Sequence, residues 1–115
     1  MKRLQQRLRA LPPAILGTLA RGIEKESLRA GLDGNTVGYE TIAAAGPHAC
    51  TLHWIRNDGE VRDGDLLLLD AGIELDSLYT ADITRTIPIS GTFSPVQRKI
   101  YETVLEAADA ARAVV

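Results

Sequence analysis

The sequence predicts an α+β fold in which helices lie before and after an antiparallel sheet, and three observations support this. Apolar residues recur every three or four positions over residues 15–23 and again over 96–115, which is the spacing of an amphipathic helix. Between these segments, residues 66–86 have apolar and β-branched residues on both sides of a polar break, as two strands with a connecting loop do. We expect a helical lead-in over residues 1–34, a sheet over 35–93 and a helix over 94–115.

The composition is that of an ordinary soluble globular domain and excludes several classes of partner. The chain has 115 residues, enough for one small domain, and its formal net charge of −2 favours neither nucleic acid nor an acidic membrane surface. No run of residues has the length of a secretion signal or a membrane span. Cys50 is the only cysteine, which excludes an internal disulfide and favours a reducing compartment, so we expect the cytoplasm.

Two helices are expected in the lead-in. Leucines at helical spacing mark the first over residues 1–10, and the two prolines at 12–13 end it. A second helix opens at Pro13, presents an apolar stripe and stops near Gly31 and Gly34. At the other end of the chain, Ser94, Pro95 and Gln97 form a capping box for the last helix. That helix has no stop signal before Val115, so we expect a truncated frame.

The residues before the central hairpin are expected to form turns and two short strands. Residues 35–39 are rich in turn formers, whereas 41–45 and 49–55 are predicted strands. The small residues of 41–45 would allow close packing. Cys50 is expected to be a small buried residue, and His48 has no assigned role. Asn57-Asp58-Gly59 is predicted to be a tight turn.

The central hairpin brings two carboxylates together if its turn is centred on Asp76. Asp70 and Asp82 are equally far from that residue, so they would lie directly opposite each other with Cβ atoms about 5 Å apart. Opposed like charges destabilise a sheet unless a shared proton or a cation neutralises them. Carboxylate pairs that bridge two metal ions are common in hydrolases. The alternative is that both residues merely flank a solvated loop.

The sequences of several segments resemble those of one enzyme family. LLLLDAG, TADITRT and SGTFSPVQRKIYETVLEA follow GYETIAAAGPHACTLHW in this order, and together they resemble the Xaa-Pro aminopeptidase and prolidase family of metallopeptidases. The resemblance is clear from about residue 38 to 115 and weak before it. It implies a partial pita-bread fold of the creatinase and aminopeptidase type, namely the first half of a catalytic domain.

The resemblance also implies roles for individual residues. Asp70 would bind one of two divalent metal ions, expected to be manganese, and Asp82 would bridge both ions. His53, in the LHW motif, would lie in the active site and contact the substrate without binding metal. The small residues of 41–45 would line the floor of the substrate cleft, and the alternative that they only allow close packing stays open. The spacing between the two aspartates is one residue longer than in some relatives, and the extra residue would lie in the loop.

The implied activity is hydrolysis of the bond between an N-terminal residue and proline, in a peptide with proline at its second position. One histidine and two glutamates that complete the family's metal site have no match in this chain. We therefore expect this chain alone to be inactive and to associate with a complementary half-domain or with a second copy. The alternative function is that of a non-catalytic pita-bread protein that binds peptides or partners.

Overall fold

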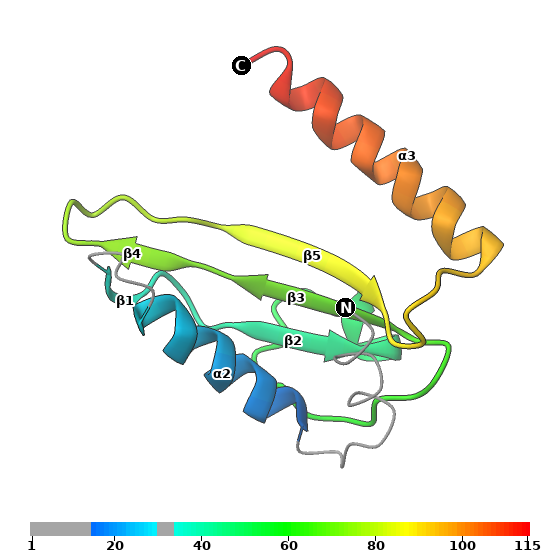
Figure 1. The fold of residues 1–115 in the computed structure, drawn as a ribbon, viewed down its shortest axis with the longest axis horizontal. Helices are drawn as coiled ribbons and strands as arrows, with labels where there is room; N and C mark the ends of the chain where they lie inside the picture. Colours follow the sequence, from blue (N-terminus) through cyan, green and yellow to red (C-terminus); the bar gives the residue numbers. More distant parts are fainter. Residues whose placement is uncertain (1–14, 30–33) are drawn as a thin grey trace.

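The computed structural model describes residues 15–29 and 34–115, and the first expected helix, over residues 1–10, lies outside them. Figure 1 shows the described elements. In chain order they are α2 (Ile15–Arg29), β1 (Gly34–Val37), β2 (Ile42–Ala45), a 3₁₀ helix η1 (Gly46–Cys50), β3 (Leu66–Ala71), β4 (Ile73–Leu75), β5 (Ile83–Pro88) and α3 (Pro95–Arg112). The α+β class and the antiparallel pairing of the strands agree with the prediction.

The strands form two antiparallel sheets, and the strands of one are interleaved along the chain with those of the other. β3 lies between β2 and β5, while β1 pairs with β4. A hydrogen bond of 3.1 Å from the Gly38 amide to the Gly72 carbonyl continues the β1–β4 pairing toward the larger sheet. The strand β1 was not expected, because its sequence is rich in turn formers. Pairing with β4 outweighs that local preference, as tertiary context often does in strands.

The central hairpin exists, but the predicted register is wrong by two residues. Its tight turn runs from Leu75 to Leu78, which has a φ of +65°. The centre of the hairpin is therefore Ser77 rather than Asp76, and Asp70 lies opposite Thr84 instead of Asp82. Side chains alternate between faces with period two, so a shift of two positions keeps the side chains of both aspartates on one face.

The core lies between α2 and one face of the larger sheet. Leu16 and Ala20 of α2 pack with Ala43 and Ala45 of β2 and with Leu67 of β3, and all five residues are buried. Alanine in β2 allows the helix to approach the sheet closely, so the packing interpretation of residues 41–45 accounts for Ala43 and Ala45. The opposite face of β3 carries the side chains that alternate with Leu67, and Asp70 is one of them.

The second predicted strand, over residues 49–55, is wrong. Instead, residues Gly46–Cys50 form the 3₁₀ helix η1, with Pro47 in its first turn, where the fixed φ of proline suits a helix, and turns follow it. His53 and Asn57 have φ values of +55° and +51°, which a strand cannot contain. The expectation that Cys50 is buried is also wrong, since this free cysteine is exposed at the end of η1.

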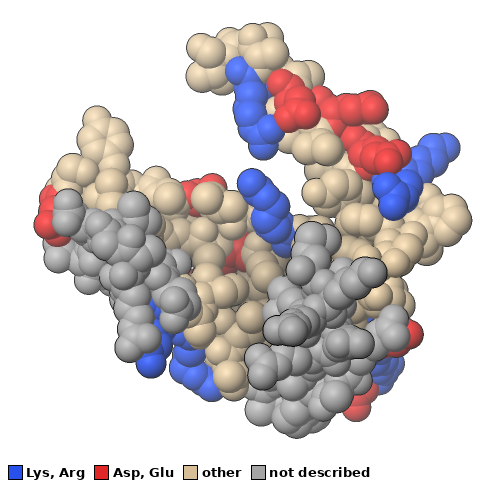
Figure 2. Space-filling model, in the orientation of Figure 1, with Lys and Arg blue, Asp and Glu red and all other residues tan. Residues whose placement is uncertain are grey.

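The last helix begins as the sequence predicts. The Ser94 side chain accepts a hydrogen bond from the Gln97 amide, and the Gln97 side chain accepts one of 2.9 Å from the Ser94 amide. The helix then rises away from β5 (Figure 1), and the space-filling view in Figure 2 shows a hollow between it and the sheet. Val96, Ile100 and Val104 are 69, 61 and 63% exposed, so this helix has an apolar face that the described residues leave open.

Neither α2 nor α3, the α-helices in the part of the chain that the structure describes, has the length and hydropathy of a bilayer-spanning segment.

Candidate metal centre

The two aspartates occupy neighbouring strands at one end of the hairpin. Asp70 is the next-to-last residue of β3, where it is half-buried opposite Ile42 of β2 and Thr84 of β5. Asp82 directly precedes β5 and is exposed. An apolar strand with neighbours on both sides fixes the position of Asp70, while Asp82 is placed by the first residues of the adjacent strand.

Tyr39 joins the two carboxylates through a single hydroxyl. Its Oη lies 2.5 Å from Oδ1 of Asp70 and 2.9 Å from Oδ1 of Asp82. The two carboxylate oxygens are therefore no farther apart than the sum of these distances. Burial, followed by the hydrogen bonds to Asp70 and Asp82, raises the pKa of the Tyr39 phenol above its ordinary value. The raised pKa favours the neutral form of the hydroxyl, which donates hydrogen bonds.

The pair of carboxylates suits a divalent cation on grounds of charge. A tyrosine hydroxyl has one hydrogen, so it can donate one full hydrogen bond. If that bond goes to one ionised carboxylate, the other carboxylate oxygen receives none. A cation beside the two oxygens removes their repulsion, and carboxylate oxygens are ligands that magnesium, calcium and manganese prefer. Within residues 15–29 and 34–115, no group of three or more acidic, histidine or cysteine side chains gathers to hold a metal ion.

His53 faces the same groove as the carboxylates. An open groove of about 410 Å³ is lined by Tyr39, Glu40, Ile42, His53, Ile55, Asp70 and Asp82. His53 lies in the loop after η1, in a left-handed conformation that costs a residue with a side chain about 1–2 kcal/mol. Strained positions of this kind cluster at functional sites. The structure thus brings together the three residues that the sequence selected, although His53 reaches the groove from a loop and not from a strand.

The loop that carries His53 is held by an asparagine. Asn57 accepts a hydrogen bond of 2.6 Å from the Ala43 amide and donates one of 2.8 Å to the Thr41 carbonyl. Its side-chain amide therefore pairs with the edge of β2 as the backbone of a further strand would. The predicted tight turn at Asn57-Asp58-Gly59 is not formed: the chain only bends at Gly59, and the asparagine acts at long range instead.

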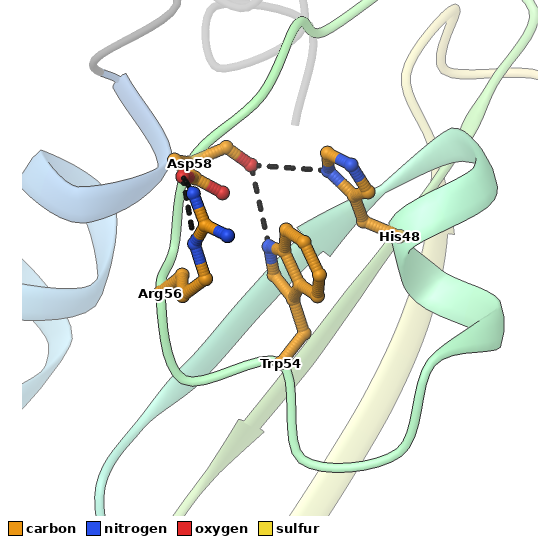
Figure 3. Close-up of polar contacts among 4 residues, drawn as sticks. All are labelled: His48, Trp54, Arg56 and Asp58. Carbon is orange, nitrogen blue, oxygen red and sulfur yellow. Dashed lines mark hydrogen bonds and ion pairs between the residues drawn. The ribbon is translucent and has the colours of Figure 1, made fainter.

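Four side chains brace the same loop around Trp54, as Figure 3 shows. The rings of His48 and Trp54 are stacked with centroids 4.0 Å apart, and Arg56 lies 5.3 Å from the centroid of the Trp54 ring system. Arg56 also forms an ion pair of 2.9 Å with Asp58, whose carbonyl accepts a hydrogen bond of 3.4 Å from the Trp54 indole. His48, which has no assigned role in the sequence, thus packs in the structure that supports His53.

Replacing Asn57 by alanine is expected to destabilise the chain by about 1–3 kcal/mol, because the buried Ala43 amide loses its acceptor. The free energy of unfolding in urea measures this effect. Replacement of the exposed Asp63 by alanine, in the neighbouring turn, serves as the control and should change it by less than about 0.5 kcal/mol. Equal stabilities of the Asn57→Ala variant and the parent would show that the loop is held by other contacts.

Comparison with known proteins gives a consistent result. The sequence profile of metallopeptidase family M24 matches residues 2–115. Xaa-Pro aminopeptidase 1 of Streptomyces coelicolor is 66% identical over 88 residues, which are 76% of this chain and 18% of that protein. The Xaa-Pro aminopeptidase of Escherichia coli is 52% identical over 68 residues, 59% of this chain and 15% of that protein.

Solved structures give the same answer for the fold. A histidine-to-alanine variant of Escherichia coli aminopeptidase P superposes with a TM-score of 0.75 at 39% identity, covering 92% of this chain and 23% of that chain. Proline aminopeptidase P II from Yersinia pestis superposes with a TM-score of 0.72 at 39% identity, covering 91% of this chain and 24% of that chain.

The helices and antiparallel sheet of this chain therefore form part of the pita-bread fold of the aminopeptidase P structures. This chain belongs to metallopeptidase family M24. It spans about a fifth of the length of the relatives it matches, so it contains one part of the structure that those enzymes have.

Proposed function

We propose that this chain supplies the first part of the active site of an Xaa-Pro aminopeptidase that uses two divalent metal ions, with manganese the expected metal. In this proposal Asp70 binds one ion, Asp82 bridges both, and His53 contacts the peptide substrate. The substrate is a peptide with proline at its second position. A complementary part of the catalytic domain supplies the remaining metal ligands.

The observation that carries the proposal is the convergence of Asp70, Asp82 and His53 on one groove. These residues come from three separate segments of the chain. The Tyr39 hydroxyl lies between the carboxylates of Asp70 and Asp82 and holds these two groups close together, so that one cation can neutralise their negative charge. The identity of 66% to Xaa-Pro aminopeptidase 1 of Streptomyces coelicolor over 88 residues supports the same function.

In this proposal the residues of the groove have different roles. Bound divalent ions supply a water of lowered pKa and a polarised substrate carbonyl. Asp70 and Asp82 hold the negative charge that binds the ions on one face of the sheet. Ile42 and Ile55 line the groove beside them and give it apolar surface for the proline ring. His53, which has ring nitrogens for hydrogen bonding, lies where a peptide in that groove can be held.

The single cysteine of the chain bears on the cellular compartment in which the protein works. Cys50 is exposed and free, and an exposed thiol persists best in a reducing compartment. We therefore propose that the protein works in the cytoplasm.

A chimeric enzyme tests the proposal. The 88-residue segment of Streptomyces coelicolor Xaa-Pro aminopeptidase 1 that matches this chain is replaced by the corresponding residues of this chain. Loaded with Mn²⁺, the chimera is expected to release the first residue from a peptide with proline at its second position. A folded chimera that binds Mn²⁺ and does not cleave this peptide would contradict the proposal.

His53→Ala in the chimera is expected to lower kcat/KM by about 10²-fold or more, because a group that positions substrate or moves a proton commonly contributes that much. Its Mn²⁺ content should match that of the parent chimera. His48→Ala is the control for the ring beside the same loop, and it should act through stability and have a smaller effect on kcat/KM. Loss of metal in step with loss of turnover in His53→Ala would make His53 a ligand and contradict its assignment.

A further inference from the structure

We propose that Tyr39 is the positioning residue of this site: its hydroxyl sets the separation of Asp70 and Asp82 before a metal ion arrives. The inference rests on the proposed function, since it takes the two aspartates as ligands. It adds a residue that does not itself bind metal and that the sequence patterns alone did not select.

The geometry of the hydroxyl carries the inference. Oη of Tyr39 lies within hydrogen-bond distance of one oxygen from each aspartate, at 2.5 and 2.9 Å. The tyrosine comes from the segment between β1 and β2, whereas the aspartates belong to β3 and the start of β5. Tyr39 therefore links the edge of the sheet to both strands of the hairpin, and a change in its position would move one carboxylate relative to the other.

The ring of Tyr39 is itself held in place by the backbone of the hairpin. A β-carbon at Gly72 would lie 2.5 Å from Cε1 of the Tyr39 ring and would overlap the carbonyl oxygen of Ala81. The ring thus packs directly onto the chain two residues after Asp70, where only glycine leaves room. The adjacent Gly38 amide donates a 3.1 Å hydrogen bond to the Gly72 carbonyl. Backbone and ring contacts together determine where the hydroxyl points.

The arrangement also explains why the site tolerates two carboxylates without a metal ion. One hydroxyl hydrogen is shared between two acceptors, so the pair is held close while its negative charge is only partly compensated. A cation that enters binds oxygens that are already near each other, and it does not have to pull two strands together first. Groups that orient metal ligands in this way typically change metal affinity by about 10–100-fold when they are removed.

Tyr39→Phe tests the proposal, because it removes the hydroxyl and keeps the ring that packs on Gly72. Binding of Mn²⁺ to the 115-residue chain is followed by the loss of the free-ion electron paramagnetic resonance signal. We expect Tyr39→Phe to raise the dissociation constant by about 10-fold or more. Tyr79→Phe removes the hydroxyl of an exposed tyrosine at the far end of the hairpin, and we expect it to leave the constant unchanged.

A double-mutant cycle separates positioning from a general loss of structure. In an Asp82→Asn background the hydroxyl has one ionised carboxylate left to orient, so Tyr39→Phe should then have a much smaller effect on Mn²⁺ binding. A Tyr39→Phe variant that lost affinity by unfolding would lose it equally in both backgrounds. Equal effects in both backgrounds would therefore overturn the proposal.

A measurement that keeps the hydroxyl of residue 39 covers the case in which Tyr39→Phe does not fold. The chain has three tyrosines, so incorporation of 3-fluorotyrosine gives three ¹⁹F resonances, and Tyr79→Phe and Tyr101→Phe assign that of Tyr39 by elimination. We expect Zn²⁺ to shift the Tyr39 resonance and Mn²⁺ to broaden it most. Binding of either metal without a response at Tyr39 would overturn the proposal.

The outcomes distinguish this inference from the proposed function. If Asp70→Asn abolishes Mn²⁺ binding and Tyr39→Phe leaves it unchanged, the aspartates are ligands and Tyr39 does not position them. If Asp70→Asn leaves binding unchanged, the assignment of the aspartates is itself wrong. If the chain binds no Mn²⁺ at millimolar concentration, the pair is not set for a cation and the inference falls.

Discussion

Asp70→Asn in the chimera is expected to lower turnover of an Xaa-Pro peptide by roughly 10³-fold or more. Removing a charged metal ligand takes away several kcal/mol of the stabilisation that bound metal gives the transition state, and each 1.4 kcal/mol is tenfold in rate. Asparagine has nearly the volume of aspartate, so the strands around residue 70 keep their packing. Initial rates with Mn²⁺ in excess, together with metal content by elemental analysis, measure the effect.

Asp76→Asn is the matched control for this change. Asp76 is exposed in the tight turn of the same hairpin, and its removal should leave turnover and metal content within about twofold of the parent chimera. Turnover that survives Asp70→Asn with full metal content would show that Asp70 is not a ligand.

Asp70→Asn lowers turnover, but it should not lower the stability of the metal-free chain. Asp70 and Asp82 repel each other when both are ionised, so Asp70→Asn is expected to raise the free energy of unfolding at pH 7 and low salt, or to leave it unchanged. An aspartate whose negative charge stabilises the fold, through an ion pair or charged hydrogen bonds, would instead lose stability on this change. Stability and turnover therefore separate a metal ligand from a structural residue, in line with the usual trade-off at active sites.

The pairing of Asp70 and Asp82 on one face could be predicted because side chains alternate between the two faces of a strand, so an exact register was not needed. A turn centred on Asp76 was the simplest choice, and the true centre is Ser77. The error moved the partner of Asp70 by two residues, and in a strand two residues return to the same face. An error of one residue would have placed the carboxylates on opposite faces and hidden the site.

The loop before the hairpin could not be predicted in the same way. Residues 49–55 have the apolar and polar alternation of a strand, but a 3₁₀ helix with Pro47 in its first turn reaches Cys50, and His53 has a left-handed backbone. Trp54 stacks on His48, and Asn57 bonds to β2, so long-range partners decide the shape of this segment. Short-range periodicity contains no information about such partners.

Tyr39 was missed because no periodic pattern surrounds it. It lies between two short strands in a stretch rich in turn formers, and its role becomes visible only when the hydroxyl is found between two carboxylates. The available clue was chemical: a tyrosine hydroxyl that becomes buried usually finds a hydrogen-bond partner, and two carboxylates on one face would offer one.

The 115-residue chain alone is expected to show no cleavage of an Xaa-Pro peptide above the Mn²⁺-only control. Two carboxylates form a weak, hydrated site, and no third acidic, histidine or cysteine ligand joins them within the described residues. Repeated turnover that disappears with Asp70→Ala would contradict this expectation, because the missing ligands would then have to come from this chain or from a second copy.

Activity is expected to return when the chain is mixed with the remaining part of the Streptomyces coelicolor enzyme, since the apolar face of α3 fits a large covering partner. A hollow of about 450 Å³ lies between α3 and the sheet, lined by apolar residues such as Leu66, Phe93 and Ile100. The described residues leave this surface open, and the matched relatives are several times longer than the chain. In the proposed function, a complementary half-domain would also supply the remaining metal ligands.

Ile100→Asp is expected to abolish this complementation, because it places a charge on the apolar face of α3 that the partner would have to bury at a cost of several kcal/mol. Lys99→Asp, on an exposed neighbouring position of the same helix, is the control and should leave both association and turnover largely intact. Sedimentation velocity of the mixture measures association, and peptide cleavage measures restored activity. If Ile100→Asp assembles and restores turnover as well as the parent chain does, α3 is not the surface that the second half covers.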